Sequence, residues 1–361
     1  MQIEWIQGVD FRCYRTLSYS PAPQLNILTG PNGQGKTNLL EGLALLAVGR
    51  SFRGAKPAEM PRWGTGVARV SGEVRHGETT RLVRREIGQR EDGAWGVTGD
   101  ACPWARVVPF SWQDVAILNG PPQARRNFID GFAGKLFPAH LTTRARYRQI
   151  LARRNHLLQS RMDEGALREA LAPWDDQLAA VGSALVSRRR QAVEEIRREV
   201  SRIYPDIGGK GILEVEYRSV LAEGGTVGTG VEALGARLRE ERRRGQTLVG
   251  PHRDDLAIEI DGHDARAYGS RGQQRLVALA LRLAEAGPVA AAVGSRPILL
   301  LDDALSELDP DVQQQVLRYI GRAGQVFLTT AEGTRPAVHA AWWEVRAERV
   351  EEMALATAGA A

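Results

Sequence analysis

The sequence predicts an α/β fold in which a buried parallel sheet presents a phosphate-binding loop at one edge. A short apolar strand, Leu25–Thr29, runs directly into a glycine-rich loop, and a helical pattern follows over residues 36–47. A second apolar run, residues 297–301, ends in two carboxylates. Such a run is typical of a parallel strand covered by helices on both faces, and ligands gather at the carboxyl ends of these strands.

The loop at residues 30–37 reads GPNGQGKT and matches G-x-x-x-x-G-K-[ST] at every fixed position. Its glycines let backbone N–H groups converge on a phosphate at the positive end of the next helix. Lys36 is expected to reach the β- and γ-phosphates, and the Thr37 hydroxyl to ligate Mg²⁺. ATP and Mg²⁺ are therefore the expected cofactors; a glycine-rich turn without a ligand is the alternative. The expected nucleotide-binding residues of this segment are Gly30, Pro31, Asn32, Gly33, Gln34, Gly35, Lys36, Thr37 and Asn38.

Asp302 and Asp303 follow the second apolar run. At the ligand-binding edge of the sheet, Asp302 is expected beside Mg²⁺, and Asp303 is expected to orient or deprotonate the attacking water. The alternative is that the two carboxylates cap the next helix. Residues 306–309 extend the expected site, and Asp309 is counted among its nucleotide-binding residues.

Residues 268–275, YGSRGQQR, precede another apolar-periodic helix. Ser270 can cap this helix, and Gly272 allows a ligand close to the backbone. The position of this segment, between the loop and the acidic strand, resembles the [LF]SxGQ signature of ABC-type ATPases. In that class one subunit's signature closes over the γ-phosphate held by another, so the resemblance implies a head-to-tail dimer with two ATPs. The signature residues expected to bind nucleotide are Ser270, Gly272, Gln273 and Gln274.

Gln113 falls where the same class places a residue that bridges Mg²⁺ and the attacking water. It is therefore a candidate catalytic and metal-binding residue, with a polar turn residue as the alternative. After residues 325–328, the class often places a histidine that senses the γ-phosphate, whereas this chain carries Thr329 and Thr330. We expect slow hydrolysis for this reason.

The expected fold is an ABC-type P-loop ATPase head with an added antiparallel β subdomain and a short helical arm domain. Residues 1–138 would form the first part of the head, including an antiparallel meander within 52–110. Residues 139–204 would form the arm, with turns at Gly165 and Pro173. Residues 205–361 would complete the head, after a flexible loop at 224–230 and a basic helix at 232–244.

Composition restricts the remaining possibilities. The net charge of +5 and pI near 9.4 permit DNA binding without establishing it, because nearly every basic residue is arginine and only four are lysine. No apolar run is seen to approach the roughly 20 residues that a bilayer requires. The first residues do not read as a signal peptide, and Cys13 and Cys102 make no disulfide framework. We expect a cytoplasmic protein without a membrane partner.

Six segments resemble the RecF family of bacterial recombination mediators, which is related to the heads of SMC and Rad50 proteins. The segments are residues 10–15, 30–43, 120–130, 249–255, 268–285 and 297–309. The resemblance implies ATP-dependent dimerisation, slow DNA-stimulated hydrolysis and binding to double-stranded DNA at gaps or junctions with single strands. It also implies that RecR and RecO are partners in loading recombinase onto SSB-coated single strands. Similar proteins more often carry Glu at position 113, which leaves the role of Gln113 open.

Three other classes fit less well. SMC and Rad50 heads insert a much longer coiled coil than the 139–204 segment. A transporter ATPase subunit usually has its signature closer to the loop, whereas Lys36 and Ser270 are 234 residues apart. An ATPase fused to a nuclease would need more chain after Asp303.

Overall fold

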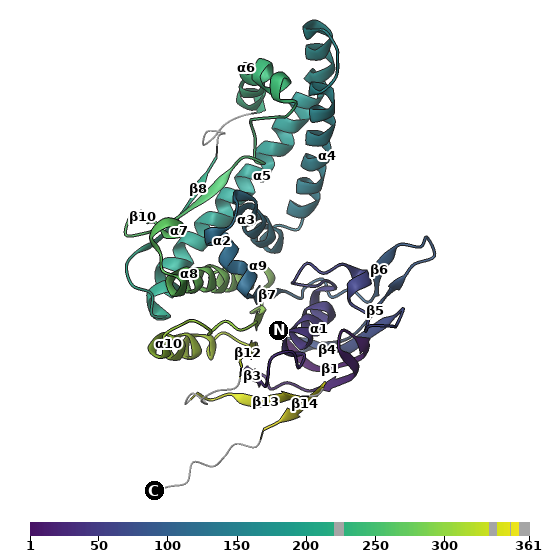
Figure 1. The fold of residues 1–361 in the computed structure, drawn as a ribbon, viewed down its shortest axis with the longest axis vertical. Coiled ribbons are helices and arrows are strands. Elements are labelled where there is room, and N and C mark those ends of the chain that lie inside the picture. The colour runs from purple at the N-terminus through teal and green to yellow at the C-terminus, as the bar shows by residue number, and fades with distance from the viewer. Residues whose placement is uncertain (220–226, 332–337, 347, 354–361) are drawn as a thin grey trace. The chain divides into compact units, whose positions relative to one another are not determined.

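The computed structural model describes residues 1–219, 227–331, 338–346 and 348–353, and the chain divides into two compact units (Figure 1). The first, which we call the head unit, comprises Met1–Asp114, Arg202–Lys210 and Ser270–Ala361. The second, the arm unit, comprises Val115–Ser201 and Gly211–Gly269. Each unit is described by itself below.

The head unit contains a six-stranded sheet in the order β14-β13-β3-β12-β11-β7. All neighbouring pairs are parallel except β13 and β14. Every residue of β11 is buried, as expected for an apolar strand covered on both faces. The strands are β3 (Leu25–Thr29), β7 (Val107–Phe110), β11 (Ile298–Leu301), β12 (Val326–Thr329), β13 (Ala341–Arg346) and β14 (Arg349–Glu352).

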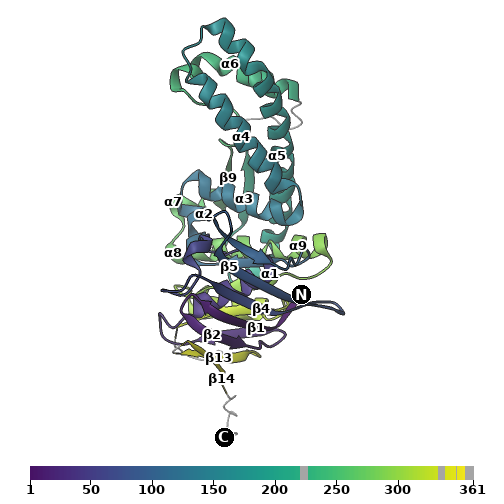
Figure 2. The ribbon, with the colours of Figure 1, turned by 90° about the vertical axis from the view of Figure 1, so that its right-hand side faces the viewer.

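A second sheet of the head unit is antiparallel and has the order β2-β1-β4-β5-β6 (Figure 2). Helix α1 (Lys36–Val48) contacts strands of both sheets, so it lies between them, and residues 39–47 are all buried. The antiparallel meander expected within 52–110 is confirmed. That meander comprises β4 (Ala68–His76), β5 (Thr79–Gln89) and β6 (Trp95–Gly99). The other two strands of the sheet, β1 (Gln2–Phe11) and β2 (Tyr14–Tyr19), precede it in the chain.

The remaining helices of the head unit include one apolar pair, α8 (Arg271–Leu283) and α9 (Ala286–Val293). By length and composition alone, Arg271–Val293 is long and apolar enough to cross a membrane. An apolar segment of this length was not predicted from the sequence. Its most apolar stretch is 61% buried inside the fold, as in a core helix pair of a globular domain. The other short elements are η1 (Pro57–Glu59), η2 (Trp112–Val115), which begins in this unit, and α10 (Pro310–Ile320).

The arm unit combines a helical bundle with a small antiparallel sheet of order β10-β9-β8. Two apolar clusters, centred on Tyr147 and Leu185 and on Leu158 and Leu171, hold the helices together. The helices are α2 (Ala116–Asn119), α3 (Pro122–Leu136), α4 (His140–Leu158), most of α5 (Glu164–Asp206), α6 (Val227–Arg244) and α7 (Ala265–Tyr268). The strands are β8 (Leu213–Arg218), β9 (Asp255–Ile260) and β10 (His263–Asp264).

The turns expected at Gly165 and Pro173 are wrong, because α5 continues through both for 43 residues. Gly165 lies in the first helical turn, where N–H groups have no partner within the helix. Pro173 removes one hydrogen bond, but the buried Leu171 and Leu178 keep the flanking turns packed. The loop expected at 224–230 lies partly outside the described residues, and residues 227–230 begin α6 instead.

The two units divide the chain differently from the expected boundaries at 138/139 and 204/205. Residues of α3 contact α4 and β9, and the Arg125–Asp255 ion pair (2.6 Å) ties α3 to β9. The contacts between α3 and β9 join segments more than a hundred residues apart, so a local change in composition did not mark them. The helical character expected of residues 139–204 is confirmed, and Leu178, Leu185 and Ile196 of α5 are buried.

Candidate nucleotide-binding site

The carboxyl ends of four neighbouring parallel strands, β3, β12, β11 and β7, meet at one edge of the head sheet. The glycine-rich loop follows β3, and Thr329 and Thr330 stand at the end of β12. Asp302 and Asp303 follow β11, and residues 111–113 follow β7. Strand order therefore gathers segments that are far apart in sequence, as the open α/β fold requires.

The backbone of the loop requires glycine at two positions. Gly30 has φ +142°, and a Cβ there would lie 2.3 Å from the Val345 carbonyl oxygen. Gly35 has φ +103°, and a Cβ there would lie 2.8 Å from Cys13 Sγ and from the Tyr14 hydroxyl oxygen. Gly35 is the N-cap residue of α1, and no side chain caps this end of the helix. The first N–H groups of α1 are thus open to an anion.

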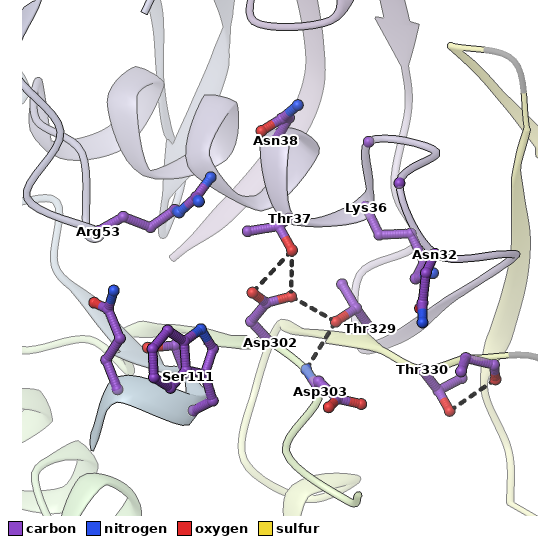
Figure 3. Close-up of a pocket in the computed structure, with 15 residues that line it drawn as sticks. Asn32, Lys36, Thr37, Asn38, Arg53, Ser111, Asp302, Asp303, Thr329 and Thr330 are labelled. Atoms are coloured by element: carbon purple, nitrogen blue, oxygen red, sulfur yellow. Dashed lines mark hydrogen bonds between the residues drawn. The ribbon is translucent and has the colours of Figure 1, made fainter. Parts of the chain in front are cut away.

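Lys36 lies against the loop that it follows (Figure 3). Its ammonium donates to the carbonyl oxygens of Gly30 and, at 2.9 Å, Pro31. The positive charge is therefore held against the start of the loop. This arrangement fits the triphosphate of a nucleotide.

Asp302 accepts hydrogen bonds from two threonines. The Thr37 hydroxyl lies 2.9 Å from both carboxylate oxygens, and the Thr329 hydroxyl lies 2.8 Å from Oδ1. Burial raises the pKa of Asp302, and the two hydroxyls only partly counter that effect. A buried carboxylate whose ionised form lacks a full counter-charge fits a site for a cation.

Among the described residues, no group of three or more His, Cys, Asp or Glu side chains forms a metal site. Mg²⁺ prefers octahedral oxygen ligands and usually binds through one or two protein groups together with substrate phosphates and water. Thr37 and Asp302 fit that pattern, because they supply one hydroxyl and one carboxylate beside the phosphate loop.

Asp303 has an unusual backbone and an accessible side chain. Its φ is +53°, its amide donates to the Thr329 hydroxyl at 2.8 Å, and its side chain is 54% exposed. Arg275 of α8 donates to the Asp303 carbonyl oxygen, and its guanidinium lies 3.7 Å from Asp303 Oδ2. The helix that begins at the expected signature is thereby tied to the candidate general base of the same chain.

These elements enclose a cleft of about 320 Å³. Figure 3 shows Thr37, Asp302 and Thr329 joined by hydrogen bonds, with Lys36 and Asn32 to one side of them and Arg53 to the other. The residues that line it are Asn32, Gly33, Gly35, Lys36, Thr37, Asn38, Arg53, Ser111, Trp112, Gln113, Asp302, Asp303, Thr329, Thr330 and Ala331.

Some of the residues expected at the nucleotide site line the cleft, and others do not. Gln113 lines the cleft from η2, and Gly30, Pro31 and Gln34 belong to the loop without lining the cleft. Asp309 precedes α10, where its side chain makes no cap hydrogen bond. The signature residues also lie outside the cleft lining of their own chain: Ser270, Gly272, Gln273 and Gln274.

The expected cap of α8 is confirmed. The Ser270 hydroxyl accepts from the Gln273 amide at 3.2 Å, and the Gln273 side chain accepts from the Ser270 amide at 2.9 Å. This reciprocal pair is a capping box. Ser270 and Gln273 are exposed, so the N-terminus of α8 is an accessible surface.

Several residues that line the cleft were not predicted from the sequence: Arg53, Ser111, Trp112 and Ala331. The hydrogen bond from Thr329 to Asp302 was not predicted either. Arg53 lies 3.9 Å from Glu41, a fully buried residue of α1 that also pairs with Arg12 at 2.6 Å. The sequence does indicate that Glu41 needs a cationic partner, because it is a carboxylate inside an apolar helix. Nothing in the sequence indicated which arginines supply it.

A buried ion pair fixes the segment that carries Gln113. Arg282 of α8 contacts Asp114 at 2.6 Å and Glu285 at 2.7 Å. Burial lowers the pKa of Arg282, and the two carboxylates outweigh it, so the net shift is upward and the pair is ionised.

We expect Arg282→Met to lower the free energy of unfolding of the head by about 3–5 kcal/mol, because it leaves the buried Glu285 and the half-buried Asp114 without a cation. Urea unfolding followed by circular dichroism measures the change. Arg318→Met, at an exposed position of α10, is the control and should stay within about 0.5 kcal/mol of the parent. Equal midpoints for the two variants would show that the pair contributes nothing to stability.

Comparisons with known proteins agree with this geometry. A family model described as an AAA domain matches residues 6–126. The DNA replication and repair protein RecF of Heliobacterium modesticaldum is 37% identical over 343 residues, which cover 91% of this chain and 92% of the relative. RecF of Symbiobacterium thermophilum is 38% identical over 352 residues and 92% of both chains.

Solved structures give the same result. A structure of the recombination mediator protein RecF with ATP, from the RecFOR pathway, has a TM-score of 0.84 at 27% identity and covers 98% of this chain and 97% of that one. An SMC head bound to a winged-helix domain of ScpA has a TM-score of 0.56 at 15% identity, covers 98% and 99%, and shows a shared fold. The chain therefore belongs to the RecF family of DNA replication and repair proteins and is an ABC-type ATPase.

Proposed function

We propose that this protein is an ATP-dependent DNA-binding protein of recombinational repair, in which ATP joins two copies of the chain into a clamp. The main support for this proposal is the position of two parts of the site. The P-loop and the acidic strand end line the cleft, whereas the capped N-terminus of α8 is exposed and lies outside that lining. A second copy can supply this N-terminus to the cleft. The composite site would then hold one ATP between each loop and the partner's signature.

Within one cleft, the loop amides and Lys36 would bind the β- and γ-phosphates, and Asn32 and Asn38 lie within reach of the nucleotide. Thr37, Asp302 and Gln113 would hold Mg²⁺. When bound, this ion would neutralise part of the negative charge of the phosphates. Asp303 would orient or deprotonate the attacking water. Thr330, whose hydroxyl donates to the Ala331 carbonyl oxygen at 3.1 Å, stands where a histidine is common, which supports slow hydrolysis.

The DNA substrate would be a gap or a junction between duplex and single strand, and DNA would stimulate hydrolysis. RecR and RecO homologues are the proposed partners, since the similar solved structure is described as part of the RecFOR pathway. The complex would help load recombinase onto SSB-coated single strands in the cytoplasm.

Ser270→Arg tests the composite site. We expect the parent to sediment as a dimer with ATP and the variant to remain monomeric, because the larger side chain blocks the closing surface. Ser270→Asp keeps an N-cap residue and places a negative charge where the partner's γ-phosphate would lie, so it should also remain monomeric. Sedimentation velocity with and without ATP measures both.

Ser201→Arg is the matched control, since it adds the same charge at an exposed position of α5 and should dimerise like the parent. If both Ser270 variants dimerise with ATP as readily as this control, the signature does not act in trans and the clamp model is wrong.

A further inference from the structure

The arm unit contains a second cavity, of about 540 Å³, which the nucleotide site does not use. It is lined by parts of α3, α4 and α5 and by His252. Segments 120–130 and 249–255, two of the six that carry the family resemblance, both contribute to it. Four arginines line this cavity, which we call the arm pocket: Arg126, Arg144, Arg148 and Arg189.

One carboxylate lies at the base of the arm pocket and orders its arginines. Asp130 is 1% exposed and contacts Arg189 at 2.8 Å, Arg144 at 2.9 Å and His140 at 3.0 Å. Burial alone would raise the pKa of Asp130, but these partners outweigh it and lower the pKa to about 2. The carboxylate is therefore ionised at neutral pH and offsets a single positive charge.

His252 adds no charge to the arm pocket. One ring nitrogen, Nε2, lies 3.0 Å from the Thr247 carbonyl oxygen and must donate to it, so Nδ1 accepts from the Tyr147 hydroxyl at 2.8 Å. Burial, the main cause, lowers the pKa of His252 to about 4. With four arginines, one ionised aspartate and a neutral histidine, the lining carries a formal charge of +3.

The guanidinium groups of Arg144 and Arg126 are held in place, whereas all the donors of Arg148 remain available. Arg144 uses Nε on Asp130 and Nη2 on the Asn127 side chain (2.9 Å). Arg126 donates to the Asp254 carbonyl oxygen at 2.9 Å. Among the residues that the structure describes, Arg148 has no ion-pair or hydrogen-bond partner, although it lies one helical turn from Arg144. Preorganised guanidinium forks with spare donors suit phosphate oxygens, which they can bind bidentately.

The surroundings favour a polyanion over a single small ion. Helix α4 contains five arginines and no Asp or Glu. Four of them, at positions 144, 146, 148 and 153, are at least partly exposed. Arg144 and Arg148 lie four residues apart and share the face at the arm pocket, whereas Arg146 lies on another face. A pocket with several arginines, on a helix without acidic residues, suits a chain of phosphates.

We propose that the arm pocket binds a phosphate of the DNA backbone, with Arg148 and Arg144 donating to its non-bridging oxygens and Arg126 at the rim. The inference rests on the proposed DNA-binding function and assigns part of it to the arm unit. Recognition through phosphate is independent of base sequence and weakens as salt rises.

Arg148→Glu and Arg148→Gln test the arm pocket, because removing this exposed side chain breaks no hydrogen bond or ion pair among the described residues. In the presence of ATP, fluorescence anisotropy with a gapped duplex at about 0.1 M salt should show about tenfold weaker binding for Arg148→Glu. For Arg148→Gln, the slope of log K against log salt should fall by about 0.9, the loss of one phosphate contact. ATP binding by either variant should equal that of the parent.

Arg146→Glu is the matched control, since it makes the same charge change on the same helix outside the arm pocket. An equal loss of DNA affinity for Arg146→Glu and Arg148→Glu would indicate diffuse charge and overturn the assignment. If the parent binds DNA and Arg148→Glu binds equally well, the arm pocket is excluded and the proposed function stands. Absence of DNA binding by the parent overturns both.

Free nucleotide offers the same phosphate chemistry as DNA. Calorimetric titration of ATP into Lys36→Ala, whose cleft is disabled, separates the two sources. We expect the same weakened ATP binding, about 100-fold or more below the parent, in Lys36→Ala and in the Lys36→Ala/Arg148→Gln double variant. Residual binding that disappears in the Lys36→Ala/Arg148→Gln double variant would assign the arm pocket to a free nucleotide and overturn the assignment to DNA.

Discussion

Lys36→Ala is expected to lower the affinity for ATP by about 100-fold or more and to abolish ATP-dependent dimerisation. The ammonium of Lys36 lies at the carbonyl oxygens of Gly30 and Pro31, within the phosphate-binding loop. Each charge-assisted hydrogen bond to a phosphate contributes about 1.5–3 kcal/mol, so the loss of two such bonds gives about 3 kcal/mol or more. Calorimetric titration with ATP and Mg²⁺ measures the change.

Lys210→Ala provides the control for this experiment, because Lys210 is exposed and lies outside the cleft lining. It should bind ATP like the parent. Dimerisation of Lys36→Ala at the parent's ATP concentration would mean that the loop does not hold the nucleotide that joins the subunits.

The parts of the site formed by contiguous residues could be predicted from the sequence. A strand, a loop with fixed glycines and a helix follow one another along the chain, so local rules place Gly30, Lys36 and Thr37 without knowledge of the tertiary fold. The same holds for Asp302, because four apolar residues and two carboxylates identify the end of a buried strand.

The contact between Thr329 and Asp302 could not be predicted in this way. It depends on β12 lying between β3 and β11, and strand order is a property of the whole sheet. The sequence places Thr329 and Thr330 where the class often has a histidine, but it does not show that the Thr329 hydroxyl donates to Asp302. Arg53 was missed for a related reason, since its role depends on burial of Glu41 inside α1.

The arm shows where local rules fail for a different reason. Pro173 disfavours a helix interior by about 3 kcal/mol, so the sequence predicted a turn there. The structure keeps the helix because Leu171 and Leu178, on either side of Pro173, are buried in the apolar clusters of the arm. Tertiary packing outweighs the local cost, and only the packed partners on α4 and α6 reveal it.

Asp303→Asn is expected to lower ATP turnover by about 100-fold or more while ATP binding and the dimer persist. General-base catalysis contributes about 10²–10⁴-fold, and asparagine cannot accept the proton. The variant suits the backbone, because asparagine tolerates the left-handed conformation at φ +53°. Single-turnover hydrolysis measures the rate, and sedimentation with ATP measures the dimer.

The matched control for this variant is Asp311→Asn, an exposed position in the first turn of α10 outside the cleft lining, which should hydrolyse ATP at the parent's rate. Unchanged turnover in Asp303→Asn would remove this carboxylate from the mechanism. If the Asp303→Asn dimer forms with ATP but no longer dissociates, then ATP binding and ATP hydrolysis have separate roles. Binding would close the interface between two copies, and hydrolysis would open it, so an inactive Asp303 would leave the clamp closed.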